Sequence, residues 1–429
     1  MPIADSSDDD VPFWRLFDAL PKCHVLIEQC PVSQLQSSLD MVLWEPKPLQ
    51  LQLVPAKRDM VFRPRGEVSK QAVLRLGEVV SKSTGVWGEM ESIAKGNPRL
   101  EQLRHNAVST MVGSKANSTL NSYLPYTVKW SKFCEEFGFQ EYPASNAHFI
   151  FFIEDLIGKA KEKRNKSGVV TTAVYAVDFV HGIMGLPKPG AEACIKLMLE
   201  SARKALARPT VRKKPLTQEV VWKLIKHFVP DMAFYTLNNL RFAVYCALAF
   251  VLEARFMDII DVCPNNIVDY GDRMVVFLEM TKTDQYREGA FVPFMNSGEP
   301  QGAYALVEHL LDALPVGQEG LSIFRRVGWG HRKGEFFRNE TMSYTLVSDG
   351  IKEALGAVGE DPAIYGLHSF RSGAKSHVDK KQKDLPVGER IPERLSNKHG
   401  RWTGNSKAAL GYNEDDSDDQ LLVPTVVQL

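Results

Sequence analysis

The chain has 429 residues, of which 44 % are hydrophobic and 24 % are charged, a composition typical of globular proteins. Its longest apolar stretch, residues 242–252, is shorter than the roughly 18 residues that a membrane-spanning helix needs, so we expect no membrane partner. The six cysteines form no Cys-x-x-Cys pair, which predicts reduced thiols in an intracellular protein and no structural zinc. The acidic start of the chain does not resemble a secretory signal.

Charge is distributed unevenly, although the formal net charge is zero. Residues 98–214 carry 18 Lys and Arg against 10 Asp and Glu, a net charge of +8. Residues 1–97 carry 11 against 13, and residues 215–429 carry 23 against 29. The basic central segment therefore predicts a polyanionic partner.

The first half of the chain divides into an extension and a helical domain. Residues 1–97 are rich in Pro, Gln and Ser and have no assignable role, although a helix is plausible from Ser69 to about Ser92, with Leu74 on its apolar face. Residues 98–213 carry apolar residues at helical spacing. The helices expected there cover residues 117–137, 144–157, 169–183 and 191–207.

The second half predicts a mixed domain from residue 214 to 413. Thr217 is placed to cap a helix that ends near Phe228, and residues 240–262 form a strongly apolar helical stretch. Residues 273–280 and 290–294 have strand character and would pair as a hairpin. Further helices are expected at 303–314, 341–355 and 371–380. The predicted fold class is α+β, mainly helical with a small antiparallel sheet.

Chemically distinctive residues gather in the last quarter of the sequence. The motif His-Ser-Phe-Arg at 368–371 is followed by His-Gly-Arg-Trp at 399–402 and, ten positions later, by Tyr412. Upstream lie Arg255, in the apolar stretch, and Lys282, between the two expected strands. This set in this order resembles the active site of the tyrosine recombinases (the phage-integrase family), nearest to the branch found in eukaryotic mobile elements such as Crypton-type transposons. The resemblance covers roughly residues 98–416.

The resemblance implies a role for each residue around a scissile DNA phosphate. Arg255 and Arg371 would hold its non-bridging oxygens, because a guanidinium stays charged and donates to two oxygens together. Lys282 would protonate the leaving 5′ oxygen. The indole of Trp402 would donate its single N–H to the phosphate, with His399 as the second candidate for that position.

The implied reaction passes through a covalent intermediate. Tyr412 would attack the phosphate and form a 3′-phosphotyrosyl link, with His368 as its base or orienter. The link conserves the energy of the broken DNA bond, so neither ATP nor a metal nor any other cofactor is expected. Single residues leave other interpretations open: Arg255 could pair with Asp258 or Asp261, and Lys282 could be an ordinary solvated residue of a turn.

Two basic runs are candidates for contact with the DNA backbone, which attracts cationic side chains by counterion release. The first is the segment 203–214, which resembles an interdomain linker, and the second lies near residue 163. Either could also be a solvated surface that contacts nothing. The candidate residues are Arg203, Lys204, Arg208, Arg212, Lys213, Lys214, Lys163 and Arg164.

The sequence thus predicts a site-specific recombinase or integrase of a mobile element, acting on double-stranded DNA as a homo-tetramer on two duplexes. It would comprise an extension (1–97), a helical core-binding domain (98–213), a catalytic domain (214–413) and an acidic tail (414–429) that either docks on a neighbouring protomer or stays solvated. Action in the nucleus is expected if the host is eukaryotic. The alternatives are a non-catalytic DNA-binding protein derived from such an enzyme and a strand relaxer resembling type IB topoisomerases.

One spacing departs from the family pattern. Arg371 and Trp402 are 31 positions apart, which is longer than usual. A polar loop within residues 380–390 would accommodate the difference at small energetic cost, but it could loosen the docking of the Tyr412 segment.

Overall fold

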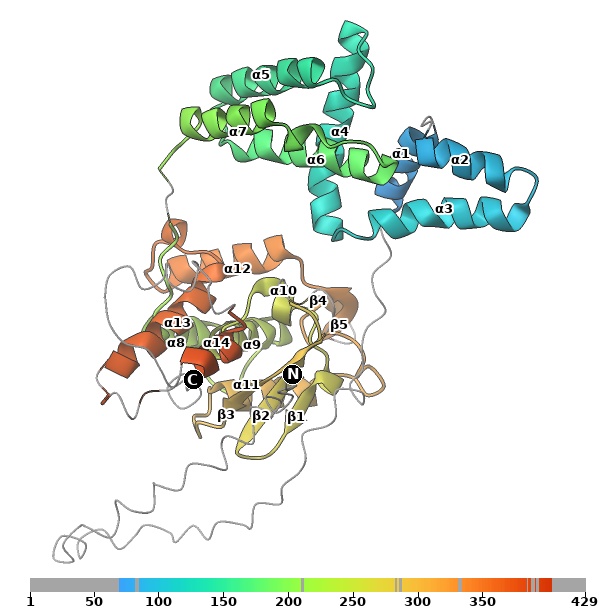
Figure 1. The fold of residues 1–429 in the computed structure, drawn as a ribbon. Helices are drawn as coiled ribbons and strands as arrows, with labels where there is room; N and C mark the ends of the chain where they lie inside the picture. The colour runs from blue at the N-terminus through green and yellow to red at the C-terminus, as the bar shows by residue number, and fades with distance from the viewer. Residues whose placement is uncertain are drawn as a thin grey trace, which may run out of the picture. The chain divides into compact units, whose positions relative to one another are not determined.

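The computed structural model of the chain describes residues 69–81, 85–209, 212–281, 284, 288–330, 334–383, 385–386, 390 and 393–402. These residues form two compact units, which divide between residues 211 and 212 (Figure 1). Within the described residues, no helix is both long and apolar enough to cross a membrane.

The first unit consists of helices, drawn in blue to green in Figure 1. Gly138 and Gly185 end α4 and α6 in the left-handed conformation, at φ values of 66° and 71°, and glycine adopts this conformation without a Cβ penalty. The expected helices are confirmed, and a further helix, α3, follows the Asn97 cap. The helices are α1 (Lys70–Ser81), α2 (Gly85–Ala94), α3 (Pro98–Val112), α4 (Asn117–Phe137), α5 (Asn146–Glu162), α6 (Gly168–Met184) and α7 (Ala193–Ala205).

Two hydrophobic clusters hold the helical unit together. One is centred on Trp130 of α4 and includes apolar side chains of α5, α6 and α7. The other joins α1, α2 and α3 to α6, with Trp87 donating its indole N–H to the carbonyl of Ile183 at 2.8 Å. The helical unit therefore begins before the predicted start at residue 98. The helix expected from Ser69 to about Ser92 is confirmed for its described residues from Lys70 on, which lie in α1 and α2. Leu76, Val79 and Val80 are buried, whereas Leu74 is exposed rather than part of the apolar face.

The second unit surrounds a large core with helices and two small antiparallel sheets. Thr217 caps α8 as predicted, with its side chain accepting from the backbone N–H of Val220. The fold class expected from the sequence, mainly helical with a small antiparallel sheet, is confirmed. The elements are α8 (Gln218–Phe228), α9 (Leu237–Val251), α10 (Phe256–Ile259), β1 (Ile267–Asp269), β2 (Arg273–Leu278), β3 (Ala290–Met295), α11 (Ala303–Asp312), β4 (Arg325–Gly330), β5 (Gly334–Thr341), α12 (Tyr344–Ala357), α13 (His368–Lys383) and α14 (Glu393–Gly400).

The sheets confirm the predicted hairpin and add strands to it. β2 pairs with β3 in antiparallel register, with Val276 opposite Val292. β1, which the sequence analysis missed, pairs on the other edge of β2. β4 and β5 form a separate two-stranded sheet, also missed. Their glycines and charged residues lack the apolar alternation that marks a strand in a sequence.

The apolar stretch 240–262 is not one helix, contrary to the prediction. α9 is buried on all sides in the core and ends at Val251. Glu253 then adopts a φ of +43°, and the backbone N–H of Ala254 returns to the carbonyl of Ala249 at 3.1 Å. This turn ends α9 in the left-handed conformation that glycine usually supplies, and α10 begins after it. The turn brings Arg255 to the edge of the core.

α13 is fixed in the core by a close backbone approach. The N–H of Leu216 donates to the carbonyl of Ser369 at 2.9 Å. A Cβ on Gly373 would lie only 1.8 Å from the carbonyl oxygen of Leu216, so only glycine allows this approach. Leu216 is therefore held against α13, and the backbone N–H of Lys214 donates to the carbonyl of Ile364, before that helix, at 2.8 Å.

Candidate functional site

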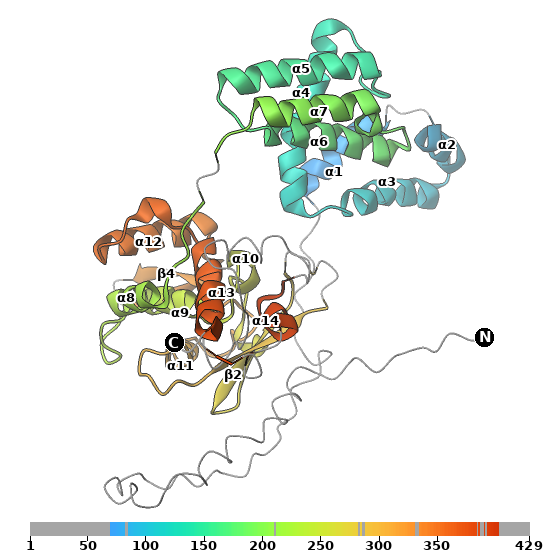
Figure 2. The same ribbon diagram turned by 60° about the vertical axis from the view of Figure 1, so that its left-hand side comes forward.

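Four predicted site residues come together in the second unit. Arg255 comes from the turn after α9, Arg371 from α13, and His399 and Trp402 from the end of α14. α13 and α14 lie near one another in both views of the fold (Figures 1 and 2), and a hydrogen bond between Lys375 and Ser396 joins them. Two further catalytic candidates, Lys282 and Tyr412, lie outside the described residues.

His368 differs from the other members of this set in its exposure. It begins α13, one turn before Arg371, as the sequence predicted. Its side chain is exposed, however, whereas that of Arg371 is fully buried. The role of His368 as base or orienter stays a prediction.

Arg371 is held from several directions. Its two terminal nitrogens donate to the backbone carbonyls of Glu253 and Gly400. Its guanidinium carbon lies 3.8 Å from the centroid of the Trp402 ring, within the range of a cation–π contact. Burial, and then the charges of Arg401 and Arg255, lowers the pKa of Arg371 to about 9. Arg371 therefore keeps its charge at neutral pH in one fixed orientation.

The cluster contains three arginines, Arg255, Arg371 and Arg401, of which Arg255 is the most accessible to solvent. Its side chain is 23 % exposed, and its terminal nitrogen lies 3.6 Å from the carboxylate of Asp258. Its backbone N–H donates to the same carboxylate at 3.0 Å and so caps α10. The structure thus contains the Arg255–Asp258 pair that the sequence left open as an alternative. Partial exposure still leaves Arg255 able to meet an anion.

Arg401, to which the sequence analysis gave no role, completes the cluster. One terminal nitrogen donates to the carbonyls of Leu252 and Glu253, both at 3.2 Å, and to Asp258 at 3.4 Å. Burial lowers its pKa, and Asp258 and Glu253 act in the opposite direction. Arg401 therefore ties the end of α14 to the turn after α9.

Glu253 is the second residue that the sequence analysis missed. Its side chain is fully buried, and it accepts the indole N–H of Trp402 at 3.1 Å. Burial raises the pKa of Glu253, although the nearby charges of Lys375, Arg371 and Arg401 act to lower it. No sequence signal marks this position, because its role follows from a turn that interrupts an apolar run.

His399 is buried as a neutral side chain. Its Nε2 lies 2.9 Å from the carbonyl of Val251, an arrangement in which Nε2 carries the proton and donates. Burial, with smaller contributions from Arg401 and Arg371, lowers its pKa to about 4. His399 thus supports the backbone at the end of α9 and carries no charge at neutral pH.

The buried state of His399 predicts a loss of stability in acid. The pKa of a histidine in the unfolded chain is about 6.5, whereas that of His399 in the folded protein is about 4. Between these two pH values the unfolded state binds a proton that the folded state does not bind, so acid favours unfolding. We expect the free energy of unfolding of the second unit to fall by roughly 2–3 kcal/mol more between pH 7 and pH 4.5 in the native protein than in His399→Gln. Urea titrations at both pH values measure this difference, and equal pH dependence in the two proteins would contradict it.

A buried ion pair lies further along α13. The ammonium of Lys375 is 2.6 Å from the carboxylate of Asp379 and donates to the hydroxyl of Ser396 on α14 at 3.0 Å. Both charged side chains are buried. The ion pair lies within α13, and it is the hydrogen bond from Lys375 to Ser396 that joins α13 to α14, the helix that ends next to Trp402.

The candidate DNA-binding residues are divided between the two units. Arg203 and Lys204, in the last turn of α7, lie 3.5 and 3.7 Å from Glu200. In the second unit, Lys213 donates to the carbonyl of Ala363. Residues 212–214 are therefore not a free linker, because their backbone and side chains are partly bound to the second unit. Like these, the remaining candidates are exposed: Arg208, Arg212, Lys214, Lys163 and Arg164.

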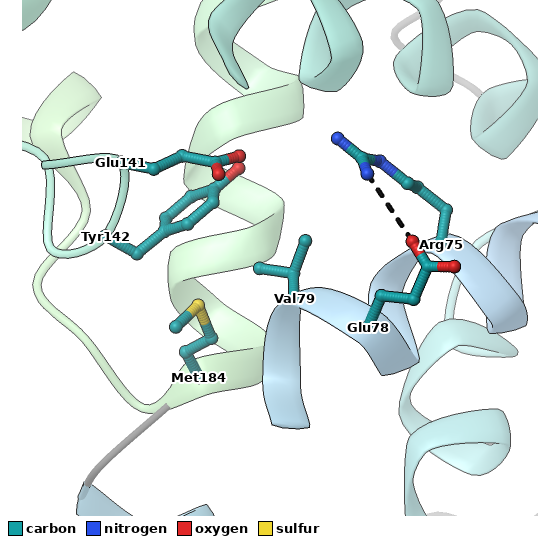
Figure 3. Close-up of a pocket in the computed structure, with 6 residues that line it drawn as sticks. All are labelled: Arg75, Glu78, Val79, Glu141, Tyr142 and Met184. Carbon is teal, nitrogen blue, oxygen red and sulfur yellow. Dashed lines mark hydrogen bonds and ion pairs between the residues drawn. The ribbon is translucent and has the colours of Figure 1, made fainter. Parts of the chain in front are cut away.

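A separate pocket lies in the helical unit (Figure 3). It has a volume of about 140 Å³ and contains none of the predicted site residues. The carboxylate of Glu141 and the guanidinium of Arg75 lie on opposite sides, and both contact Ser131. The lining residues are Arg75, Glu78, Val79, Glu141, Tyr142 and Met184.

Known proteins are similar to this chain in sequence or in fold. A protein of Selenomonas ruminantium described as an integrase/recombinase xerD homolog is 23 % identical over 274 residues, which is 64 % of this chain and 77 % of that protein. No protein-family model matches the chain.

Two solved structures align over most of the chain. The XerH site-specific recombinase bound to difH substrate is 10 % identical, with a TM-score of 0.48 over 83 % of this chain and 96 % of that one. A lambda integrase dimer bound to a COC' core site is 15 % identical, with a TM-score of 0.39 over 88 % and 99 %. At these TM-scores the fold class rests on the elements described above and not on the superpositions.

Proposed function

We propose that the chain is a tyrosine recombinase that cuts and rejoins double-stranded DNA. The observation that carries the proposal is the convergence of Arg255, Arg371 and Trp402 from three separate segments of the second unit. The similarity to the Selenomonas protein, whose description names a recombinase, supports the same class of enzyme. The finer proposals are a mobile-element role, a Crypton-like affiliation, a tetramer on two duplexes and nuclear action in a eukaryotic host.

In the proposed reaction the arginines neutralise the scissile phosphate. Arg371 uses one donor on each terminal nitrogen for a backbone carbonyl, so three of the five N–H donors of its guanidinium remain. Arg255, at the partly exposed edge, adds a second positive charge. Stabilising charge in this way lowers the barrier to attack most where water is excluded. The phenol of Tyr412 would form a bond to phosphorus and give its proton to His368 as the candidate base, while the bond from phosphorus to the 5′ oxygen breaks and that oxygen takes a proton from Lys282.

One observation favours a second candidate, a DNA-binding protein without catalytic activity. Arg371 is fully buried, and two of its donors are already committed to backbone carbonyls. A phosphate would have to reach the remaining donors inside this cluster. The two candidates differ in whether a covalent protein–DNA link forms.

A covalent trap tests the proposal. The purified chain is incubated without metal or ATP with nicked duplexes, drawn from a random pool and from the DNA that flanks its gene, whose cleaved fragments diffuse away. We expect an SDS-resistant adduct that Tyr412→Phe abolishes and that Tyr344→Phe retains, since Tyr344 is a tyrosine of the same unit that is 57 % exposed. DNA binding without any adduct would favour the non-catalytic protein.

A further inference from the structure

Glu253 occupies an unusual position in the second unit. It is a non-glycine residue with a φ of +43°, a conformation that is costly for a side-chain-bearing residue. It also places a carboxyl group in the core, where burial without strong partners is unfavourable. Two unfavourable features at one residue, next to the predicted catalytic arginines, indicate a functional requirement there.

Both the backbone and the side chain of Glu253 contact the arginine cluster. Its carbonyl accepts hydrogen bonds from Arg371 and Arg401. Its carboxylate accepts the indole N–H of Trp402 through one oxygen, and the other oxygen has no hydrogen-bond partner among the described residues. Since an indole has one N–H, this contact uses the only donor of the Trp402 side chain.

The hydrogen bond between Trp402 and Glu253 occupies the space where a side chain at Gly400 would lie. A Cβ at position 400 would be 2.2 Å from the indole nitrogen and 2.3 Å from the carboxylate oxygen. Any other residue would therefore push Trp402 and Glu253 apart. The face of the same indole lies against the guanidinium of Arg371, 3.8 Å from the ring centroid.

We propose that Glu253 is a positioning residue whose carboxylate fixes the indole of Trp402, and that the indole face in turn orients Arg371 toward the phosphate. This inference rests on the proposed recombinase function. It gives Trp402 a different role from the one that the family resemblance implies: the indole supports an arginine and does not donate to the phosphate. Glu253 acts through Trp402 and does not contact the substrate.

The first test observes the contact directly, without any DNA. The full chain is labelled with ¹⁵N at the indole nitrogens, and the Trp402 signal is assigned from its loss in Trp402→Phe. Glu253→Gly removes the carboxylate while adopting a φ of +43° without strain, and Glu253→Gln keeps an oxygen acceptor in place. We expect the Trp402 indole proton to shift upfield in Glu253→Gly, and by a smaller amount in Glu253→Gln, because a neutral amide oxygen accepts a weaker hydrogen bond than a carboxylate.

Trp87 is the internal reference for these spectra, because its indole donates to Ile183 in the other unit. Its signal should be unchanged in both variants. An unchanged Trp402 signal in Glu253→Gly would overturn the proposed contact. If the glycine variant does not fold, Glu253→Gln still tests the contact, because a Trp402 signal at its native position in Glu253→Gln would show that the indole does not donate to this side chain.

The second test measures the rate of adduct formation on a nicked duplex in a single turnover. We expect Glu253→Gly to be about 10²-fold slower, the usual consequence of a misplaced catalytic group, and Glu253→Gln to stay within about tenfold of native. Because both residues act through Arg371, Glu253→Gly combined with Trp402→Phe should be no slower than the slower single variant.

The outcomes separate the two proposals. If the native protein forms adducts but Glu253→Gly reacts at the native rate, the positioning role is overturned and the recombinase function stands. The positioning role would also be overturned if the double variant were slowed by the product of the two fold-reductions in rate that the single variants show. If the native protein forms no adduct on any duplex, the recombinase function itself is overturned, and the role of Glu253 at a phosphate falls with it.

Discussion

Arg371→Lys should slow adduct formation by about 10³-fold, comparable with the loss of a donor that stabilises developing charge. The planar guanidinium of Arg371 donates to the carbonyls of Glu253 and Gly400 while lying against Trp402. A lysine ammonium keeps the charge, but it cannot reproduce the fork or the stacking contact. We also expect the free energy of unfolding to fall by about 3 kcal/mol, because buried carbonyls lose their donors.

Single-turnover cleavage and urea unfolding measure the two effects of Arg371→Lys. Arg326→Lys is a matched control for stability, since Arg326 is an exposed arginine paired with Glu340 at 3.1 Å. It should change the free energy of unfolding by less than about 0.5 kcal/mol. An Arg371→Lys protein that cleaves within tenfold of the native rate would remove Arg371 from the proposed mechanism.

Asp379→Ala should destabilise the second unit by about 3–5 kcal/mol, because it leaves the buried ammonium of Lys375 without its closest counter-charge. Replacing the whole group is expected to cost much less. The combination Lys375→Met, Asp379→Leu and Ser396→Ala removes the charges and the hydroxyl together, and such replacements are often neutral or stabilising.

Urea unfolding of the native protein, the single variant and the triple variant distinguishes a buried ion pair from ordinary packing. If Asp379→Ala costs less than about 1 kcal/mol, the ion pair does not hold the buried ammonium of Lys375 in place. If the triple variant is as unstable as the single one, the loss comes from packing volume and not from an uncompensated charge.

Local signals in the sequence were enough for much of the fold. Thr217 predicted the start of α8, apolar residues at helical spacing predicted α4 and α6, and residues of strand character predicted the pairing of β2 with β3. The break after α9 could not be predicted, because a non-glycine residue takes the left-handed conformation inside an apolar run. Tertiary contacts of Glu253 stabilise that conformation, and they join segments about 150 positions apart.

The candidate site was predictable as a set of residues but not as a set of contacts. The motifs at 368–371 and 399–402 do meet, and Arg255 joins them. Many of their partners, however, are backbone carbonyls, such as those of Val251, Glu253 and Gly400. Every residue carries a carbonyl, so no pattern of residue types marks these acceptors. The same reason hid Arg401, which lies within a recognised motif but bonds mainly to the backbone.

The most direct measurement is to locate the DNA-linked residue in the trapped adduct. The adduct is digested with nuclease and protease, and tandem mass spectrometry identifies the peptide that carries the residual nucleotide. A tyrosine recombinase predicts a nucleotide joined through its 3′ phosphate to Tyr412. A link to any other residue, a 5′ linkage, or no linked peptide from a duplex that the protein binds would contradict the proposed function.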